Sequence, residues 1–303
     1  MPKTNVTVLK LHDEYEADRF LSGIQAKLEA CQYTPCAAGN EHATGFIEPD
    51  IEKPDVFTRV HNDIIYARIM VETRKVPDKV ANAMAAKRIA KIELDGRKVS
   101  VDQQLQIMAQ VKAELWENIS PEYTQYWVAI DAANRLTYYF APGAKSEDIS
   151  GLLRKAFESW PVETPWDAIG LNEAVGKYIN GVDIGFYIDL IDTLDIGRGK
   201  KTAKFRGCED LRSVAIQKSW VDMPQMQKVG IFFPDLELDA DVTLHGHFQF
   251  EREFKEDDEE LYDSHGAFAD VILGQDTTSK MFGLIRRIAA KHVPAGTTKK
   301  VTR

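Results

Sequence analysis

The feature that most constrains this fold is a pair of short β-hairpins, each made of two apolar segments on either side of a few turn-forming residues. Alternating apolar and polar residues indicate strands with one buried face, and connections this short force the joined strands to run antiparallel. A parallel sheet would need a long crossover after each strand. We therefore expect an α+β protein with mixed or antiparallel sheets, not a doubly wound one. The hairpins join residues 56–60 to 64–71 through His61-Asn62-Asp63, and residues 126–130 to 136–140 through Asp131–Asn134.

A helical pattern covers residues 77–117. Pro77 suits the first turn of a helix, and Asp95-Gly96 ends that helix. Ser100, with Gln103 three residues later, forms a capping box for a second helix. We expect these two helices to form a hairpin that protrudes as an arm instead of joining the core. The apolar stripe predicted for the first helix consists of Val80, Met84, Ile89 and Ile92.

The remaining segments fit two α+β portions with a boundary marked by Pro161 and Pro165. We expect an N-terminal portion made of residues 1–76 and 118–165, the arm at 77–117, and a C-terminal portion at 166–303. Ser146 is expected to cap a helix that runs to Trp160. Further helices are expected at 13–31, 171–180, 210–220 and 277–291, and further strands at 5–11, 43–48, 185–192, 201–206, 228–233 and 241–254.

Composition limits where the chain is expected to act. No apolar run approaches the roughly 18 residues that span a membrane, and the N-terminus lacks the apolar core of a signal peptide. The three cysteines, Cys31, Cys36 and Cys208, are too few for a disulfide framework. We therefore expect a cytoplasmic protein with no membrane partner.

The net charge of −9 argues at first against nucleic acid, but the acids are concentrated in one block. Residues 235–263 hold twelve acids and two bases, so the rest of the chain is close to neutral. Bases gather in residues 74–98, in 198–206 and in the tail 286–303. Such clusters can bind phosphates without reading base sequence. The predicted DNA-binding residues are Lys87, Arg88, Lys91, Arg97, Lys98, Lys200, Lys201, Lys204 and Arg206.

Catalytic motifs of the usual kinds do not occur in the sequence, and we expect neither enzymatic activity nor a cofactor. Two alternatives stay open. His245 and His247 would share one face of a strand, and with Asp239 or Asp241 they would form the site of a metal-dependent nuclease. The acidic block could instead dock a basic protein partner by imitating DNA, which would make the chain a protein-interaction module.

Seven short stretches resemble, in order and spacing, motifs of the RdgC family of recombination-associated proteins. Tyr33-Thr34-Pro35-Cys36 is similar to the family's Phe-Thr-Pro-Cys, and Gly45–Pro49 to its Gly-Trp-x-x-Pro. Ala129-Ile130-Asp131 with Asn134 resembles a Trp-Ile-Asp-x-x-Asn hairpin. The other similar stretches are Arg88–Glu93, Ser146–Val162 and, further along the chain, Gly185-Phe186 together with Phe268–Leu273.

The resemblance implies an α+β protein that dimerises head-to-head and tail-to-tail into a closed ring. Its central hole would be lined with positive charge and admit double-stranded DNA. Such proteins bind DNA with little sequence preference, and they limit the access of a RecA-type recombinase to it. The resemblance also implies association with the nucleoid, the absence of catalytic residues and cofactors, and leaves open whether single-stranded DNA is bound as well.

Some positions depart from the family pattern at the expected dimer contacts. Ser120-Pro121-Glu122-Tyr123 stands where the family has Leu-Pro-Arg-Ala-Phe, and Cys208-Glu209 stands where a Lys-Gln pair precedes Asp-Leu. Ala240 replaces a strand tryptophan. These differences indicate a divergent member, of host or phage origin. The expected dimer-interface residues are Pro121, Tyr123, Cys208 and Glu209.

Overall fold

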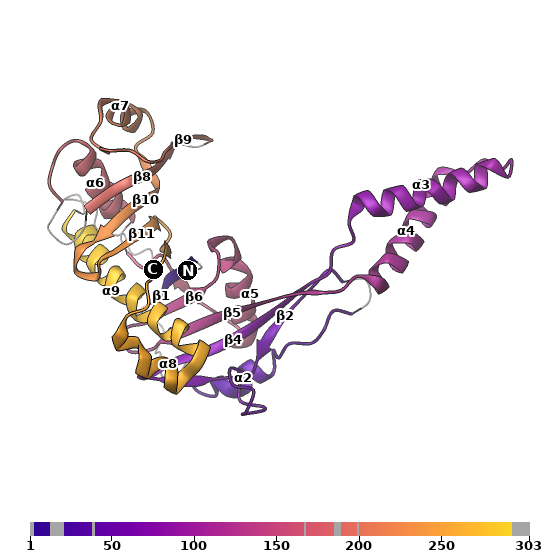
Figure 1. Ribbon diagram of the computed structural model, residues 1–303, viewed down its shortest axis with the longest axis horizontal. Helices are drawn as coiled ribbons and strands as arrows, with labels where there is room; N and C mark the ends of the chain where they lie inside the picture. The colour runs from indigo at the N-terminus through magenta and orange to yellow at the C-terminus, as the bar shows by residue number, and fades with distance from the viewer. Residues whose placement is uncertain are drawn as a thin grey trace. The chain divides into compact units, whose positions relative to one another are not determined.

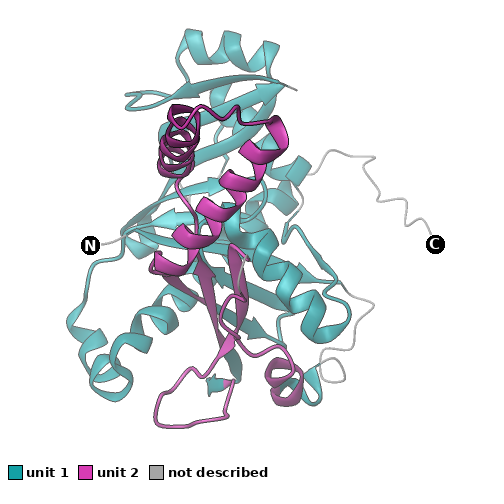
Figure 2. Cartoon of the chain, turned by 90° about the vertical axis from the view of Figure 1, so that its right-hand side faces the viewer, with its two compact units in different colours: residues 1–24, 59–66, 127–303 teal, residues 25–58, 67–126 magenta. Residues whose placement is uncertain are grey.

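The computed structural model describes residues 3–12, 21–37, 40–166, 168–184, 189–198 and 200–292. The chain divides into two compact units (Figure 2). Unit 1 comprises residues 1–24, 59–66 and 127–303, and unit 2 comprises residues 25–58 and 67–126. Two strands, β4 (Ile64–Thr73) and β5 (Glu122–Asp131), contribute residues to both units. The three portions proposed from the sequence stay a prediction.

Unit 2 is built on strand β2 (His42–Ile47), which pairs antiparallel with β4. The short helix α2 (Ile24–Glu29) leads into an extended segment that lies beside β2. The Tyr33 amide donates to the Phe46 carbonyl at 2.8 Å, and the Phe46 amide donates to the Cys31 carbonyl at 3.0 Å. These bonds give the unit a short parallel bridge next to its antiparallel ladder.

The predicted helical hairpin is present in unit 2, as α3 (Asp78–Leu94) and α4 (Val101–Asn118), beyond the ends of β4 and β5 (Figure 1). The capping box is confirmed, because Ser100 accepts from the Gln103 amide and the Gln103 side chain accepts from the Ser100 amide. The predicted apolar stripe is wrong in part: Val80 is 45% exposed. The buried seam of the hairpin consists of Val76, Ala81, Ala85 and Val111.

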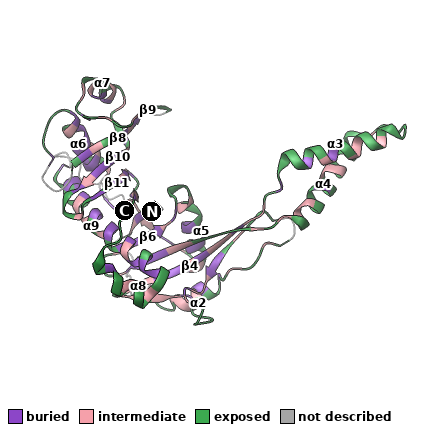
Figure 3. Ribbon diagram, viewed as in Figure 1, coloured by how far each residue is buried: buried purple, intermediate pink, exposed green. Residues whose placement is uncertain are grey.

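Most residues of α3 and α4 are exposed to solvent (Figure 3). Small alanine side chains let the two helices approach closely, which is why the seam lies one position away from the bulkier stripe. Met84, Ile107, Met108, Leu115 and Trp116 pack around it and are only partly buried.

Unit 1 is organised on an antiparallel sheet with the strand order β5-β6-β1-β12-β11-β10-β8-β9. Hydrophobic side chains of one sheet face, among them Val229, Val242 and Phe248, form the core with helices α6 (Ala168–Ile179) and α9 (Ala269–Lys291). The strands are β1 (Thr4–Leu11), β6 (Leu136–Phe140), β8 (Asp189–Arg198), β9 (Lys201–Phe205), β10 (Gln225–Phe233), β11 (Leu238–Thr243) and β12 (His247–Phe250), with β3 (Arg59–His61) on β4 and β7 (Val162–Glu163) on β1. The helices are α5 (Ser146–Phe157), α6 (Ala168–Ile179), α7 (Val214–Asp222), α8 (Glu259–His265) and α9 (Ala269–Lys291).

Both predicted hairpins are confirmed. β3 and β4 are joined by Asn62-Asp63, whose φ angles are 48° and 61°, the left-handed pair that a two-residue turn requires. β3 itself begins only at Arg59, later than predicted. In the turn after β5, the Asp131 carboxylate accepts from the amide and the side chain of Asn134. This double contact requires Asn134 to follow Asp131 by three residues, the spacing predicted for this turn.

Other local predictions are corrected. The strand expected at 241–254 is two strands, β11 and β12, separated by a turn in which Gly246 has φ 81°. A Cβ atom on Gly246 would lie 2.4 Å from the Val8 carbonyl, so the turn tolerates only glycine there. Ser146 does not cap α5, because its hydroxyl bonds to Thr7 at 2.8 Å. Residues 13–20 of the helix expected at 13–31 and residues 185–188 of the strand expected at 185–192 lie outside the described residues. The described remainder contains α2 and the start of β8.

The fold class is confirmed: the protein is α+β with a mostly antiparallel sheet. No helix among the described residues is long and apolar enough to cross a membrane.

Candidate nucleic-acid interface

The exposed side of α3 carries the first basic cluster. Lys87 and Lys91 lie one turn apart on the helix, and both are exposed. Within the described part of the chain, neither lysine forms an ion pair with an acid. Their charges are therefore available to an anion from solution.

Arg88, between these lysines, is bonded inside the hairpin. Its guanidinium donates to both carboxylate oxygens of Glu114 on α4, one of them at 2.9 Å from Nη1. This contact lowers the pKa of the Glu114 carboxyl, chiefly through the hydrogen bond from Arg88. Lys112 on α4 reaches Asp78 on α3 at 3.2 Å in the same way. Arg88 thus links the two helices, and its role in DNA binding stays a prediction.

The connection between α3 and α4 holds the other two predicted arm residues. Arg97 and Lys98 are exposed in this loop. The Arg97 guanidinium is 3.6 Å from the Asp95 carboxylate, and both side chains are more than half exposed. Solvent screens a pair of this kind strongly, so it holds Arg97 only weakly.

The second basic cluster lies on the β8–β9 hairpin of unit 1. Arg198 and Lys201 face one another across the two strands, and Lys200 lies in the turn between them. Further along β9, Ala203 and Phe205 pack on the core of the unit, which sends Lys204 to the opposite, exposed face. Lys200, Lys201 and Lys204 form no ion pair in the ranges that the structure covers.

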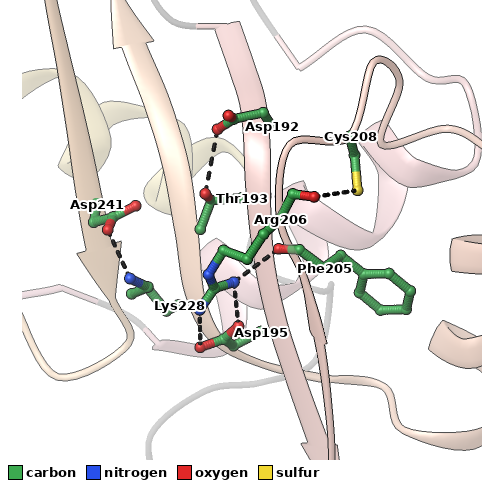
Figure 4. Close-up of polar contacts among 8 residues, drawn as sticks. All are labelled: Asp192, Thr193, Asp195, Phe205, Arg206, Cys208, Lys228 and Asp241. Carbon is green, nitrogen blue, oxygen red and sulfur yellow. Dashed lines mark hydrogen bonds and ion pairs between the residues drawn. The ribbon is translucent and has the colours of Figure 1, made fainter.

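Arg206, at the end of this hairpin, is neutralised by Asp195 on β8 (Figure 4). Its Nη2 donates to Asp195 Oδ2 at 2.8 Å, and its Nη1 donates to the Phe205 carbonyl at 2.7 Å. Next to this pair, Lys228 on β10 donates to Asp241 on β11 at 2.6 Å. Arg206 and Lys228 are therefore each already paired with a carboxylate on this part of the sheet.

The third basic cluster is only partly described. Arg286, Arg287 and Lys291 lie on the exposed side of α9. Lys299, Lys300 and Arg303 fall outside the described residues.

The residues expected at a dimer interface occupy two places. Pro121 and Tyr123 stand at the start of β5 in unit 2, where the Tyr123 side chain is 55% exposed. In unit 1, Cys208 and Glu209 follow β9, and the Cys208 amide donates to the Asp192 carbonyl at 3.2 Å. Glu209 is exposed. Their role in dimerisation stays a prediction.

The acidic block lines a groove of about 820 Å³ in unit 1. Part of its charge is compensated, because Arg252 donates to both oxygens of Asp258 at 2.6 and 2.7 Å. This pair lowers the pKa of the Asp258 carboxyl. The acids that line the groove are Asp192, Asp235, Glu237, Asp239, Asp241, Glu251, Glu253, Asp257, Asp258 and Asp276. Docking of a basic partner here stays a prediction.

The side chains of the alternative nuclease site do not converge. His245 lies exposed in the turn before β12, so it does not share a strand face with His247. His247 Nδ1 bonds to the Thr7 hydroxyl at 3.2 Å, and the carboxylate of Asp241 is paired with Lys228. Burial and the charge of Lys228 lower the pKa of His247. Among the described residues, no group of three or more His, Cys, Asp or Glu is placed to hold a metal ion.

Sequence reasoning missed a buried polar network in unit 2. Glu72 on β4 is fully buried and accepts hydrogen bonds from the Tyr33 hydroxyl at 2.5 Å and from the Cys36 amide at 2.8 Å. Arg74 Nε donates to the same carboxylate at 2.7 Å. The signal in the sequence is a single acid near the end of a strand whose other charged residue is Arg68. This network fastens the Tyr33–Cys36 segment to β4.

Comparison with known proteins identifies a family that matches the first part of the chain. A family model described as "Putative exonuclease, RdgC" matches residues 4–188. The chain is 28% identical over 141 residues to the recombination-associated protein RdgC of Edwardsiella ictaluri, a match that covers 46% of each chain. Over 141 residues it is also 28% identical to the same-named protein of an Enterobacter species, again 46% of each chain. The relative from Sodalis glossinidius is 26% identical over 160 residues, or 52% of each chain. The matched region thus spans about half the length of these relatives.

Proposed function

We propose a function from one premise, which is that this chain belongs to the RdgC family. The relatives are named as recombination-associated proteins. We propose that this chain binds double-stranded DNA without sequence preference, acts in homologous recombination, and limits the access of a RecA-type recombinase to DNA. Single-stranded DNA is a second ligand that the same charge could hold. The proposed place of action is the cytoplasm, at the nucleoid.

The observation that carries this proposal is the set of exposed lysines without an acidic partner in the described residues: Lys87, Lys91 and Lys98 in unit 2, and Lys200, Lys201 and Lys204 in unit 1. Lysines in this state can replace the counterions of DNA phosphates. Contacts to phosphate position a protein on DNA and carry no sequence information. Binding without sequence preference is the behaviour that such a surface supports.

A charge-reversal experiment tests the arm. The double variant Lys87→Glu, Lys91→Glu leaves the Arg88–Glu114 link intact, so the hairpin is expected to keep its fold. Gel-shift titrations with two duplexes of unrelated sequence should show DNA affinity lowered by about tenfold or more for both, because two phosphate contacts are lost and two repulsive charges are added.

The matched control reverses two other exposed helical lysines, in the variant Lys155→Glu, Lys218→Glu. It changes the net charge equally outside the predicted site, and we expect a much smaller loss of affinity. Equal losses in both double variants would mean that net charge, and not the α3 surface, governs binding. Unchanged affinity in the α3 variant would remove α3 from the DNA-binding surface.

We also propose that the protein acts as a homodimer that closes into a ring, with Pro121, Tyr123, Cys208 and Glu209 at its contacts. The exposure of Tyr123 supports a role in such a contact. Sedimentation should give a mass of twice 34.2 kDa. Tyr123→Ala should shift the protein towards monomer, and a purely monomeric wild-type protein would contradict this part of the proposal.

The proposed role is not catalytic, although the matching family description contains the word exonuclease. The positions of His245, His247 and Asp241 support this view, since they do not meet. Incubation of labelled DNA with the protein and Mg²⁺ or Mn²⁺ should leave its length unchanged. Shortened DNA that is lost in His247→Ala would establish the nuclease alternative.

A recombinase assay tests the last step of the proposal. A RecA-type protein that drives strand exchange should be slowed when this protein is added first, and the Lys87→Glu, Lys91→Glu variant should slow it less. If the protein restrains the recombinase by covering DNA, the variant should lose DNA affinity and inhibition of strand exchange together.

A further inference from the structure

A group of nitrogen-rich side chains in unit 1 includes no residue of the three basic clusters. It consists of Arg59 and His61, on strand β3, and His265, the last residue of helix α8. All three side chains are partly exposed. The chain segments that supply them are about 200 residues apart in sequence, so only the fold brings them together.

Arg59 is held in a defined orientation. Its guanidinium lies over the ring of the buried Phe268, with 4.2 Å between the guanidinium carbon and the ring centroid. Its Nη2 is 2.8 Å from His265 Nδ1. The other guanidinium nitrogens make no hydrogen bond within the described chain. A stacked guanidinium with a fixed plane is pre-oriented for a two-point contact with an oxyanion.

The contact with Arg59 also fixes the proton of His265. A guanidinium can only donate hydrogen bonds, so His265 Nδ1 accepts and the neutral ring carries its proton on Nε2. The ring of His61 stands edge-on to it, with 5.0 Å between centroids and 87° between planes. The fold thus brings a second imidazole, that of His61, next to His265.

The surroundings favour a negative ligand. Burial, and after it the positive charges of Arg59 and His61, lower the pKa of His265. On the elements that pack here, Asp270 accepts from the Tyr262 hydroxyl, while Asp63 and Asp263 are exposed. An oxyanion at this place would meet the charge of the Arg59 guanidinium, which has no acidic partner among the described residues.

We propose that Arg59, His61 and His265 form a binding site for a phosphate-type oxyanion, either free phosphate or a phosphate group of a nucleic acid. The anion would take two N–H donors from Arg59 and one from each imidazole. His265 donates from Nε2 while its Nδ1 keeps the contact with Arg59, so the site holds the anion with a neutral His265. The oxyanion site uses none of the lysines of α3 or of the β8–β9 hairpin. A negative result for phosphate binding at Arg59 would therefore leave the proposed DNA-binding function untouched.

Nuclear magnetic resonance of the full chain tests the site. The imidazole signals of His61 and His265 are assigned with the variants His61→Asn and His265→Asn, and sodium phosphate is added at pH 6 and constant ionic strength. Both signals should shift in a saturable way as phosphate is added. Arg59→Gln should weaken this binding by about tenfold or more, because a charge-assisted contact is lost.

The matched control is Arg212→Gln, which removes another arginine stacked on an aromatic ring, 4.3 Å from the centroid of Tyr178. It should leave the phosphate titration unchanged. Melting temperatures show whether each variant folds. A second variant, Arg59→Lys, keeps the positive charge but loses the paired N–H donors of the guanidinium, so it should also bind phosphate more weakly. Shifts that sodium chloride reproduces, or that persist in both Arg59 variants, would overturn the site.

A second titration identifies the source of the anion. Short duplex DNA replaces phosphate in the same experiment, with the Lys87→Glu, Lys91→Glu variant run beside the wild type. Arg59-dependent shifts with DNA as well as phosphate assign the site to DNA phosphates. Arg59-dependent shifts with phosphate alone assign it to a small anion. The absence of such shifts with either ligand refutes the site.

Discussion

At the scale of single residues, one buried carboxylate organises the N-terminal part of unit 2. Glu72 has no exposed surface, yet its carboxylate receives hydrogen bonds from Tyr33, Cys36 and Arg74. The hydrogen bond from Tyr33 is the first cause that lowers the pKa of Glu72, to about 2. A buried charge is tolerated only when it is paired and hydrogen-bonded in this way.

Glu72→Gln should destabilise the protein by about 1.5–3 kcal/mol, because it weakens charged hydrogen bonds and leaves Arg74 without its partner. The folded-state pKa lies below the ordinary value of 4.5. The ionised carboxylate therefore stabilises the protein above about pH 4.5, and this stabilisation is lost as the pH falls towards 2. Urea unfolding at several pH values should show a weaker acid dependence in the variant.

The exposed pair of Glu147 with Arg154 provides the control for this prediction. Glu147→Gln should change stability by less than about 1 kcal/mol, because solvent screens a surface ion pair. If Glu72→Gln and Glu147→Gln behave alike, Glu72 does not hold the segment as the geometry indicates.

At the scale of elements, the Tyr33–Cys36 segment and strand β2 fit closely because one residue of β2 has no side chain. A Cβ atom on Gly45 would lie 2.4 Å from the Tyr33 Cα and 2.5 Å from its amide nitrogen. Both neighbours are backbone atoms, which cannot move aside without breaking the parallel bridge. Two stretches that resemble family motifs, around Tyr33 and around Gly45, are thus one packing unit.

Gly45→Ala should destabilise the protein by about 1–3 kcal/mol, as overpacking does in other close contacts. The matched control is Gly151→Ala in helix α5, where an added Cβ meets nothing within 4 Å. This second change should stabilise the protein by up to about 1 kcal/mol, since alanine favours a helix over glycine. Denaturant unfolding of both variants measures the contrast, and a neutral Gly45→Ala would contradict the close approach.

At the scale of the whole molecule, the distribution of charge matters more than its sum. The net charge is −9, and ten acids line one groove of unit 1. The six lysines proposed to meet phosphate lie elsewhere in the chain and form no ion pair in the residues described. An acidic protein can therefore still bind a polyanion through local surfaces.

DNA affinity should fall steeply with salt in spite of the acidic pI of about 5.4. Each duplex phosphate contact contributes about 0.9 to the slope of log affinity against log salt, so six contacts per chain would give about 5. Gel shifts between 50 and 200 mM salt, as a rough working range, measure this slope. A slope near zero would mean that charge does not hold the DNA.

The sequence by itself determined the elements that depend on neighbouring residues. The hairpin turn at Asn62-Asp63, the contact of Asp131 with Asn134 and the capping box of Ser100 with Gln103 are all local, and each was predictable. The antiparallel character of the sheet followed from the short turns. The family resemblance was visible for the same reason, because motifs are runs of neighbouring residues.

Only the tertiary structure decided which charged groups are occupied. Lys87 and Arg88 are neighbours in a basic run, yet Arg88 is bonded to Glu114 and Lys87 is not. Arg206 is bonded to Asp195 in the same manner, and Arg59 meets His265 from about 200 residues away. A sequence gives the number of charges, but ion pairing depends on distances of a few ångströms between segments that folding brings together.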